Sequence, residues 1–322
     1  MEYGSVPGVG KPISRVVQGL TMTSTDRVEE SFELLDAVCQ AGVNTFDSGH
    51  VYGGGKCDRV FGQWVASRGL RDKVVLLDKG CHHNADRKRV TPFDLRADLF
   101  DCLARLGFDY IDMFALHRDD PSVPVGPIIE AFNEHLAAGR IKAFGASNWS
   151  HRRIAEANEY AAARGLTGMA FSSPQYSLAE CYEDPWGDTV AITGPANKDA
   201  QDWYRRTGMP VFAWSSLAGG FFSGRFRRDN LGSFQDPADQ RCVRCFCREG
   251  NFQRLDRAEQ LARSKGATPP QIALAYAIGG PLNAFPLMAA YTPDQARENA
   301  AAASIELTGE QIAWLDLRRD RP

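Results

Sequence analysis

The chain has 322 residues, of which 43% are hydrophobic and 24% are charged, and its formal net charge is −3. This composition excludes a disordered or fibrous protein, and the slightly acidic balance argues against a nucleic-acid-binding protein, which is usually basic. No apolar run approaches the roughly 18 residues of a membrane span, and Met1–Lys11 lacks the charged start and apolar stretch of a signal peptide. We therefore expect a cytoplasmic globular protein without membrane or nucleic-acid partners, whose oligomeric state the sequence does not indicate.

Short apolar runs alternate with amphipathic segments along the whole chain. Eight runs are continuous rather than alternating, as strands buried on both faces are: Arg15–Gly19, Val43–Asp47, Val74–Lys79, Tyr110–His117, Ile141–Ser147, Met169–Tyr176, Pro210–Leu217 and Asn283–Met288. Apolar spacings of three and four residues predict helices between them, for example over Ser31–Cys39, Leu95–Leu106 and Ile128–Leu136. Eight such β–α units predict an α/β fold, a closed (β/α)8 TIM barrel, formed as a single domain by residues 1–322.

Three segments depart from this regular alternation. Gly4–Pro12 is rich in Gly and Pro and predicts a hairpin that plugs the bottom of the barrel. Ala179–Asn197 and Phe221–Asn251 are long insertions after the sixth and seventh strands. Long loops in a compact barrel are usually functional, so we expect lids or binding loops there.

The eight cysteines are expected to be reduced thiols, because the chain has no export signal. Cys242, Cys245 and Cys247 lie close together, but no second Cys or His pair nearby completes the four ligands of a structural zinc site. We interpret the three as unpaired thiols in a loop and expect no metal.

Polar residues close several of the predicted strands, at the end of a barrel where active sites lie. Asp47, Lys79 and His117 end the second, third and fourth strands, and Tyr52 follows in a Gly-rich loop. A tyrosine, with an ordinary pKa of about 10, is a poor acid at neutral pH, and a nearby Lys ammonium lowers that pKa. With Asp47 fixing Lys79 and a neutral His117 orienting the reacting oxygen, the set predicts a proton donor for a developing alkoxide.

Several fragments, in order and spacing, resemble the aldo-keto reductase superfamily over nearly the whole chain. They are Asn44–Asp47, Val51–Gly53, Leu77–Lys79, Ala115–His117, Phe144–Asn148, Gln175–Tyr176, Trp214–Ala218, Phe222–Gly224 and Gln295–Asn299. The resemblance implies an NAD(P)H-dependent reductase of aldehydes or ketones, reversible as an alcohol dehydrogenase, with Asp47, Tyr52, Lys79 and His117 as its catalytic tetrad. Tyr52 would be the general acid in reduction and the general base in oxidation.

The resemblance also implies where the cofactor binds. The nicotinamide would lie over Trp214, with its carboxamide held by Ser147, Asn148 and Gln175 and with Asp47 and Gly19, Leu20 and Thr21 bordering the site. The pyrophosphate would lie along Ser215, Leu217, Gly219 and Arg225, and the adenosine near Gln295, Glu298 and Asn299. NADP(H) is the family default, but residues 286–295 contain no Lys or Arg to hold a 2′-phosphate, so NAD(H) is a close alternative.

The substrate pocket is expected to involve Met22, His82, Arg118, Trp149, Trp186 and Phe222. This mixture favours a small polar carbonyl compound, such as a sugar-derived aldehyde or ketone. Two alternatives stay open. A relative of the channel-associated family members could bind the cofactor as a regulatory or sensor subunit with little turnover. A metal-dependent barrel hydrolase would use His50, His82, His83 and His117, but a charged Lys79 is a poor metal ligand. A Rossmann dehydrogenase lacks its G-x-G-x-x-G motif here.

Overall fold

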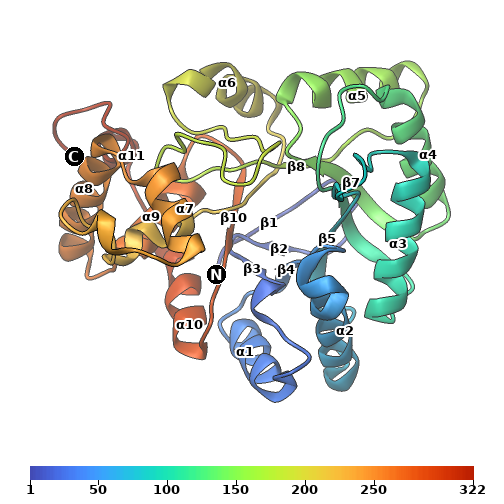
Figure 1. Ribbon diagram of the computed structural model, residues 1–322, viewed down its shortest axis with the longest axis horizontal. Coiled ribbons are helices and arrows are strands. Elements are labelled where there is room, and N and C mark those ends of the chain that lie inside the picture. Colours follow the sequence, from blue (N-terminus) through green and yellow to red (C-terminus); the bar gives the residue numbers. More distant parts are fainter.

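A closed barrel of eight parallel strands forms the centre of the computed structural model, which describes residues 1–322 (Figure 1). The strands are β3 (Val17–Gly19), β4 (Thr45–Asp47), β5 (Val75–Gly80), β6 (Ile111–Leu116), β7 (Ile141–Ser147), β8 (Phe171–Ser173), β9 (Val211–Ala213) and β10 (Ala284–Met288). They are ordered as in the sequence, and β10 pairs with β3 to close the ring. The predicted (β/α)8 barrel is therefore confirmed. Strand β8 is shorter than its apolar run because Pro174, which has no N–H to donate, follows its last residue.

Eleven α-helices surround the barrel (Figure 1). They are α1 (Val28–Gln40), α2 (Lys56–Arg68), α3 (Pro92–Leu106), α4 (Val125–Ala137), α5 (His151–Ala163), α6 (Lys198–Thr207), α7 (Pro237–Phe246), α8 (Glu249–Lys265), α9 (Pro269–Gly279), α10 (Pro293–Ala301) and α11 (Gly309–Leu315). The predicted helical stretches lie within α1, α3 and α4. No helix carries an apolar stretch long enough to cross a bilayer.

The N-terminal hairpin closes one end of the barrel. Strand β1 (Tyr3–Gly4) pairs antiparallel with β2 (Ile13–Ser14), and the hairpin crosses the middle of the barrel in Figure 1. Val6, Val9 and Ile13 are buried in one apolar cluster with inward-facing strand residues such as Phe212 and Phe285. The predicted plug is therefore present, and it leaves the carboxyl ends of the strands as the open rim.

The second long insertion is not a plain loop. It contains helix α7, which starts where the Asp236 side chain accepts hydrogen bonds from the N–H groups of Ala238 and Asp239. Cys242 and Cys245 lie on the buried face of α7 and Cys247 ends it, so the predicted location of these thiols in a loop is wrong. The spacing of three residues between Cys242 and Cys245 is the helical signal. All eight cysteines are free, as expected.

Helices α2 and α3 approach each other closely at Gly62. A Cβ atom added there would lie 2.1 Å from the backbone oxygen of Leu106. Only a residue without a side chain fits this contact, so Gly62 sets the spacing between α2 and α3.

We predict that Gly62→Ala lowers the free energy of unfolding by roughly 1–3 kcal/mol, because the backbone of Leu106 must move to admit the methyl group. Urea unfolding followed by circular dichroism measures this loss. Gly309→Ala is the matched control, since a Cβ there meets nothing within 4 Å at the first residue of α11. Equal effects of the two substitutions would contradict the close contact.

Candidate active site

Four residues from three neighbouring strand ends meet at the open rim of the barrel. Asp47 is the last residue of β4, Lys79 lies in β5, and His117 follows β6. Tyr52 begins the short 3-10 turn Tyr52–Gly55 that follows β4. Because the strands are parallel and adjacent, their carboxyl ends bring these side chains together.

A buried ion pair forms the base of this cluster. The Lys79 Nζ lies 2.5 Å from Asp47 Oδ1 and donates a second hydrogen bond of 2.6 Å to the Ser48 carbonyl oxygen. Burial alone would lower the pKa of Lys79, but Asp47 and then Tyr52 outweigh burial and raise it to about 12. Lys79 is therefore an ammonium at neutral pH, held in one position by two acceptors.

Tyr52 and His117 lie above this ion pair. The Lys79 Nζ is 5.0 Å from the centre of the Tyr52 ring, and the rings of Tyr52 and His117 meet edge to face at 5.5 Å. Loss of hydration raises the pKa of Tyr52, although Lys79 opposes this. The net direction differs from the lowered pKa expected from the sequence, because the desolvation of the site and the charge of Asp47 together outweigh the ammonium.

His117 is neutral in this site. Burial, with Lys79 as a further cause, lowers its pKa well below the usual value. A neutral imidazole can orient a carbonyl oxygen by a hydrogen bond, while the protonated tyrosine beside it remains the group that transfers a proton. The four side chains thus provide one movable proton, on Tyr52, next to a fixed positive charge.

Two residues of the site escaped the sequence analysis. The Ser48 carbonyl oxygen fixes Lys79 as described above. Gly49 lies against both rings, because a Cβ there would be 3.3 Å from atoms of His117 and of Tyr52. Both follow directly after Asp47, but a backbone acceptor and a close ring contact leave no signal in a single sequence.

A pair of buried carboxyl groups lies behind Lys79. Asp58 comes from α2 and Asp78 from β5, and with the Cys102 thiol of α3 their ligand atoms lie within 4.8 Å of one another. Asp78 accepts the Lys79 backbone N–H at 2.7 Å, and Ser48 Oγ donates to Asp58. One oxygen of each carboxyl group, Oδ2, has no hydrogen-bond partner.

Two carboxylates cannot both be ionised at this separation in a dry site. Burial and then the neighbouring Asp58 raise the pKa of Asp78 well above its usual value. This favours a proton shared by the pair, whereas Arg105, whose Nη1 lies 3.9 Å from Asp58 Oδ2, favours the ionised form of Asp58. Among His, Cys, Asp and Glu residues, this is the only group of three close enough to hold a metal ion, and none of the four histidines considered above belongs to it.

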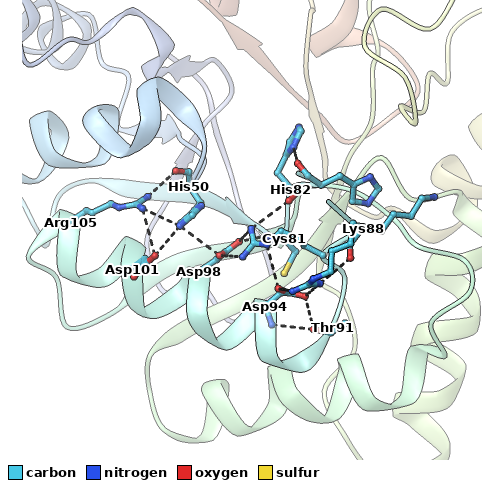
Figure 2. A network of polar contacts seen from close by, with 12 residues as sticks. His50, Cys81, His82, Lys88, Thr91, Asp94, Asp98, Asp101 and Arg105 are labelled. Carbon is cyan, nitrogen blue, oxygen red and sulfur yellow. Dashed lines mark hydrogen bonds and ion pairs between the residues drawn. The ribbon is translucent and has the colours of Figure 1, made fainter. Parts of the chain in front are cut away.

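Helix α3 anchors the loop that carries His82. Figure 2 shows Asp94, Asp98 and Asp101 in a row along one face of this helix. Arg89 makes two hydrogen bonds to Asp98, of 2.6 and 3.0 Å, and Arg87 makes two to Asp94 (Figure 2). Asp98 also accepts the backbone N–H of Cys81, which has a φ of 62° that is unusual for a residue with a side chain. These contacts place the His82 ring 4.8 Å from that of His117.

The residues expected to hold the nicotinamide carboxamide lie on neighbouring strand ends. Ser147, Asn148 and Gln175 are all buried. Asn148 has a φ of 60°, and its amide donates 3.1 Å hydrogen bonds to the His117 carbonyl oxygen and to Ser147 Oγ. The centre of the Trp214 ring lies 5.1 Å from that of the partly exposed Trp186 ring. The buried Nε1 of Trp214 has no hydrogen-bond partner.

The segment after β9 offers free backbone donors. Ser215 and Ala218 have positive φ angles of 50° and 52°, and the N–H groups of residues 215–217 make no hydrogen bond to the chain. Consecutive unpaired N–H groups in such a turn form an anion-binding concavity, which fits a pyrophosphate. Leu217 and Gly219 lie in or next to this turn, and Arg225, beyond it, pairs with Asp239 at 2.5 Å.

The expected adenosine-binding residues lie on α10. Asn299 is buried, and its amide contacts the sulfur of Met288 at the end of β10. Gln295 Oε1 accepts the Tyr291 N–H, whereas Glu298 is exposed. Arg297 is bound to Asp294 at 2.5 Å and lines a different hollow, beside Met1 and Ala41.

The expected pocket residues divide into two groups. Met22, His82 and Trp186 retain exposed surface, whereas Arg118 is buried and hydrogen-bonds to the His117 carbonyl oxygen. Trp149 and Phe222 are only 0% and 1% exposed, so neither has the free surface to line an open pocket. Gly19 ends β3, and Leu20 and Thr21 begin the 3-10 turn that Met22 completes. A separate hollow of about 850 Å³ lies at the plugged end, beside Pro7, Lys142 and Asn283, away from the tetrad.

Comparison with known proteins identifies the family. The model of the Aldo/keto reductase family matches residues 18–317, nearly the whole chain. The chain belongs to the aldo/keto reductase family. The solved structure of a thermostable aldo-keto reductase, Tm1743, in complex with the inhibitor epalrestat has the same fold, with a TM-score of 0.73, 22% identity, and coverage of 98% of this chain and 99% of that one.

Curated relatives of this chain carry different names. An uncharacterized oxidoreductase of Bacillus subtilis, YrpG, is 26% identical over 98% of this chain and 95% of its own. A probable voltage-gated potassium channel subunit beta of rice is 24% identical over 95% and 92%. A norsolorinic acid reductase of Emericella nidulans is 28% identical over 88% and 70%. Family membership supports oxidoreductase chemistry and general carbonyl reduction.

The buried carboxyl pair predicts how stability depends on pH. Above the ordinary Asp pKa of 3.8 this pair binds more protons in the folded chain than in the unfolded chain, so its contribution to the free energy of unfolding falls as the pH rises through that range. We predict that Asp78→Asn flattens this fall and leaves the protein at least as stable as the wild type at pH 8, because the amide can donate to the unpartnered Asp58 oxygen. Urea unfolding at several pH values measures it.

Asp72→Asn is the matched control, because Asp72 is exposed and makes no ion pair. This variant should keep the wild-type dependence on pH. An Asp78→Asn protein with the wild-type slope, and with lower stability at pH 8, would show that both carboxyl groups are ionised in the folded chain.

Proposed function

We propose that this chain is an NAD(P)H-dependent reductase of aldehydes and ketones, reversible as an alcohol dehydrogenase. The observation that carries the proposal is the cluster of Tyr52, the Lys79–Asp47 ion pair and neutral His117 at the open rim of a family barrel. A reduced nicotinamide, when bound, supplies the hydride for the carbonyl carbon. Side chains of this protein supply the proton and stabilise the negative charge that develops on the substrate oxygen.

Tyr52 is the general acid in this proposal. Its raised pKa keeps the hydroxyl protonated until negative charge develops on the substrate oxygen, and the proton then passes to that oxygen. The Lys79 ammonium stabilises the phenolate that remains, and Asp47 keeps the ammonium in place. His117 orients the carbonyl by a hydrogen bond, and in the oxidative direction Tyr52 takes the proton back.

The residues present fit a nicotinamide dinucleotide. Ser147, Asn148 and Gln175 would hold the carboxamide over Trp214, and the free N–H groups of residues 215–217 would bind the pyrophosphate. At the adenosine end, Arg297 is committed to Asp294 and residues 286–295 supply no cation. We therefore infer NADP(H) as the family default, with weak discrimination against NAD(H).

The substrate would be a small polar carbonyl compound, of which sugar-derived aldehydes and ketones are one class. His82 beside His117, and Arg118 at the rim, supply the polar wall of the pocket. A cytoplasmic location agrees with the free thiols.

A second candidate function is a cofactor-binding regulatory subunit with little turnover. Two relatives named as potassium channel beta subunits, from rice and from Schizosaccharomyces pombe, favour it. The two functions share the cofactor site and differ in turnover, so one set of measurements separates them.

We predict that Tyr52→Phe lowers carbonyl reduction by about 10²–10⁴-fold, because the proton donor is lost while the ring stays. Cofactor oxidation at 340 nm, screened over aldehydes, ketones and keto-sugars, measures the loss. Quenching of tryptophan fluorescence should show that the variant still binds the cofactor. Wild-type turnover in the variant would require another acid, and cofactor binding without any wild-type turnover would favour the regulatory subunit.

We predict that kcat/KM with NADPH exceeds that with NADH by well under a thousandfold. Only neutral groups such as Thr292 and Tyr291 can meet the 2′-phosphate, and a neutral hydrogen bond contributes about 0.5–1.5 kcal/mol. Steady-state kinetics with one good substrate measure the ratio. A preference above a thousandfold, equivalent to roughly 4 kcal/mol, would reveal a phosphate clamp elsewhere in the chain.

A further inference from the structure

Arg118 is a buried guanidinium without a carboxylate partner. It follows His117 directly, is only 7% exposed, and donates a single hydrogen bond, of 2.9 Å, to the His117 carbonyl oxygen. Arg71 and Arg254 each have a fully buried Nε without a hydrogen-bond partner, but no nitrogen of Arg118 is in this situation. Its remaining donors are therefore accessible to solvent and free to bind a ligand.

The acidic groups around Arg118 are engaged elsewhere. Its neighbour Asp119 binds Arg153 at 2.8 Å, and Asp47 binds Lys79. Asp98 and Asp94 hold Arg89 and Arg87 on the facing loop, as Figure 2 shows for the α3 side of this network.

The insertion after β8 carries Asp184 and Asp188, the two carboxylates whose charges act favourably on Arg118. Asp184 accepts backbone N–H groups of Trp186, Gly187 and Thr189 in its own loop. Asp188 is exposed and lies 3.8 Å from His83 and 3.9 Å from Lys88. Neither lies within ion-pair distance of Arg118. Burial lowers the pKa of Arg118, and the charges of Asp184 and Asp188 oppose this only in part.

A buried cation without a counter-charge is costly, and such a group is compensated when a ligand brings the charge. The guanidinium of Arg118 is bound to the backbone of His117, a member of the tetrad, so an anion held by Arg118 would lie next to the tetrad. That anion is not the cofactor pyrophosphate. Arg118 follows β6, whereas the free N–H groups follow β9, and β7 and β8 separate these strands.

We propose that Arg118 binds a carboxylate group of the substrate, so that the enzyme reduces aldehydes or ketones that carry a carboxylate. A planar guanidinium with free donors matches a carboxylate, which accepts two parallel hydrogen bonds. A phosphate dianion would call for further cations, and Arg87 and Arg89 are already engaged. The inference rests on the proposed reductase function and names its substrate class.

Matched acids and esters test this proposal. Succinic semialdehyde and 4-carboxybenzaldehyde differ in length, and the methyl ester of each keeps the aldehyde but removes the charge. We expect wild-type kcat/KM for at least one acid to exceed that for its ester by tenfold or more. In Arg118→Met the value for the acid should fall by about 10–100-fold, the range of a charge-assisted hydrogen bond, and the acid-to-ester ratio should approach one.

Two further variants keep the test decisive. Arg118→Lys retains the charge and should keep part of the preference for the acid, even if the Met variant folds poorly. Arg152→Met removes a charge from an exposed position on α5, where the side chain is 79% exposed, and should keep the wild-type ratio.

Three outcomes would overturn the proposal. A wild-type ratio near one for both pairs would exclude a carboxylate subsite. Equal losses for acid and ester in Arg118→Met would make Arg118 a positioning residue for His117. If none of the four aldehydes oxidises either cofactor, whereas other carbonyls do, the substrate class is wrong. If no carbonyl of any class is reduced, the reductase function itself fails.

Discussion

The buried ion pair between Lys79 and Asp47 is the interaction on which the rest of the site depends. Removing one partner of such a pair leaves an uncompensated charge in a dry place, at a cost of about 3–5 kcal/mol. In the intact pair, the cost of burying the two charges is offset by the short distance between the charged atoms and by a backbone acceptor, the Ser48 carbonyl oxygen. The barrel supplies this geometry because β4 and β5 are adjacent and parallel. Tyr52 and His117 then acquire their protonation states from the ammonium and from the lack of water around them.

Charge around the rim is compensated in layers. Innermost, Asp47 balances Lys79. Behind it, burial favours a proton shared by Asp58 and Asp78 over a double negative charge. Outside, the carboxylates of α3 neutralise the basic loop that carries His82 (Figure 2). Arg118 stands out against this pattern, because it makes no ion pair within the chain and only the more distant Asp184 and Asp188 oppose its charge.

The sequence predicts the barrel and the tetrad well, for a physical reason. Strands buried on both faces leave continuous apolar runs, and Asp47, Lys79 and His117 interrupt those runs at the ends where a barrel gathers its chemistry. The carboxyl pair is hidden from such analysis, because Asp58 reaches Asp78 only when α2 packs on the barrel. The direction of the Tyr52 pKa was mispredicted for a similar reason. The sequence reveals the ammonium, but desolvation depends on the finished fold.

The pairing that closes the barrel has a consequence for how the chain acquires its structure. Val17 pairs with Leu287, and the hairpin residues Val6 and Val9 pack in one cluster with strands from both ends of the sequence. During synthesis the ribosome releases the plug first and its last partner strand near the end. The apolar faces of Val6, Val9 and the early strands thus stay uncovered until β10 emerges. Such distant pairing slows folding, and it leaves apolar surface of the unfinished barrel open to aggregation until the last strand pairs.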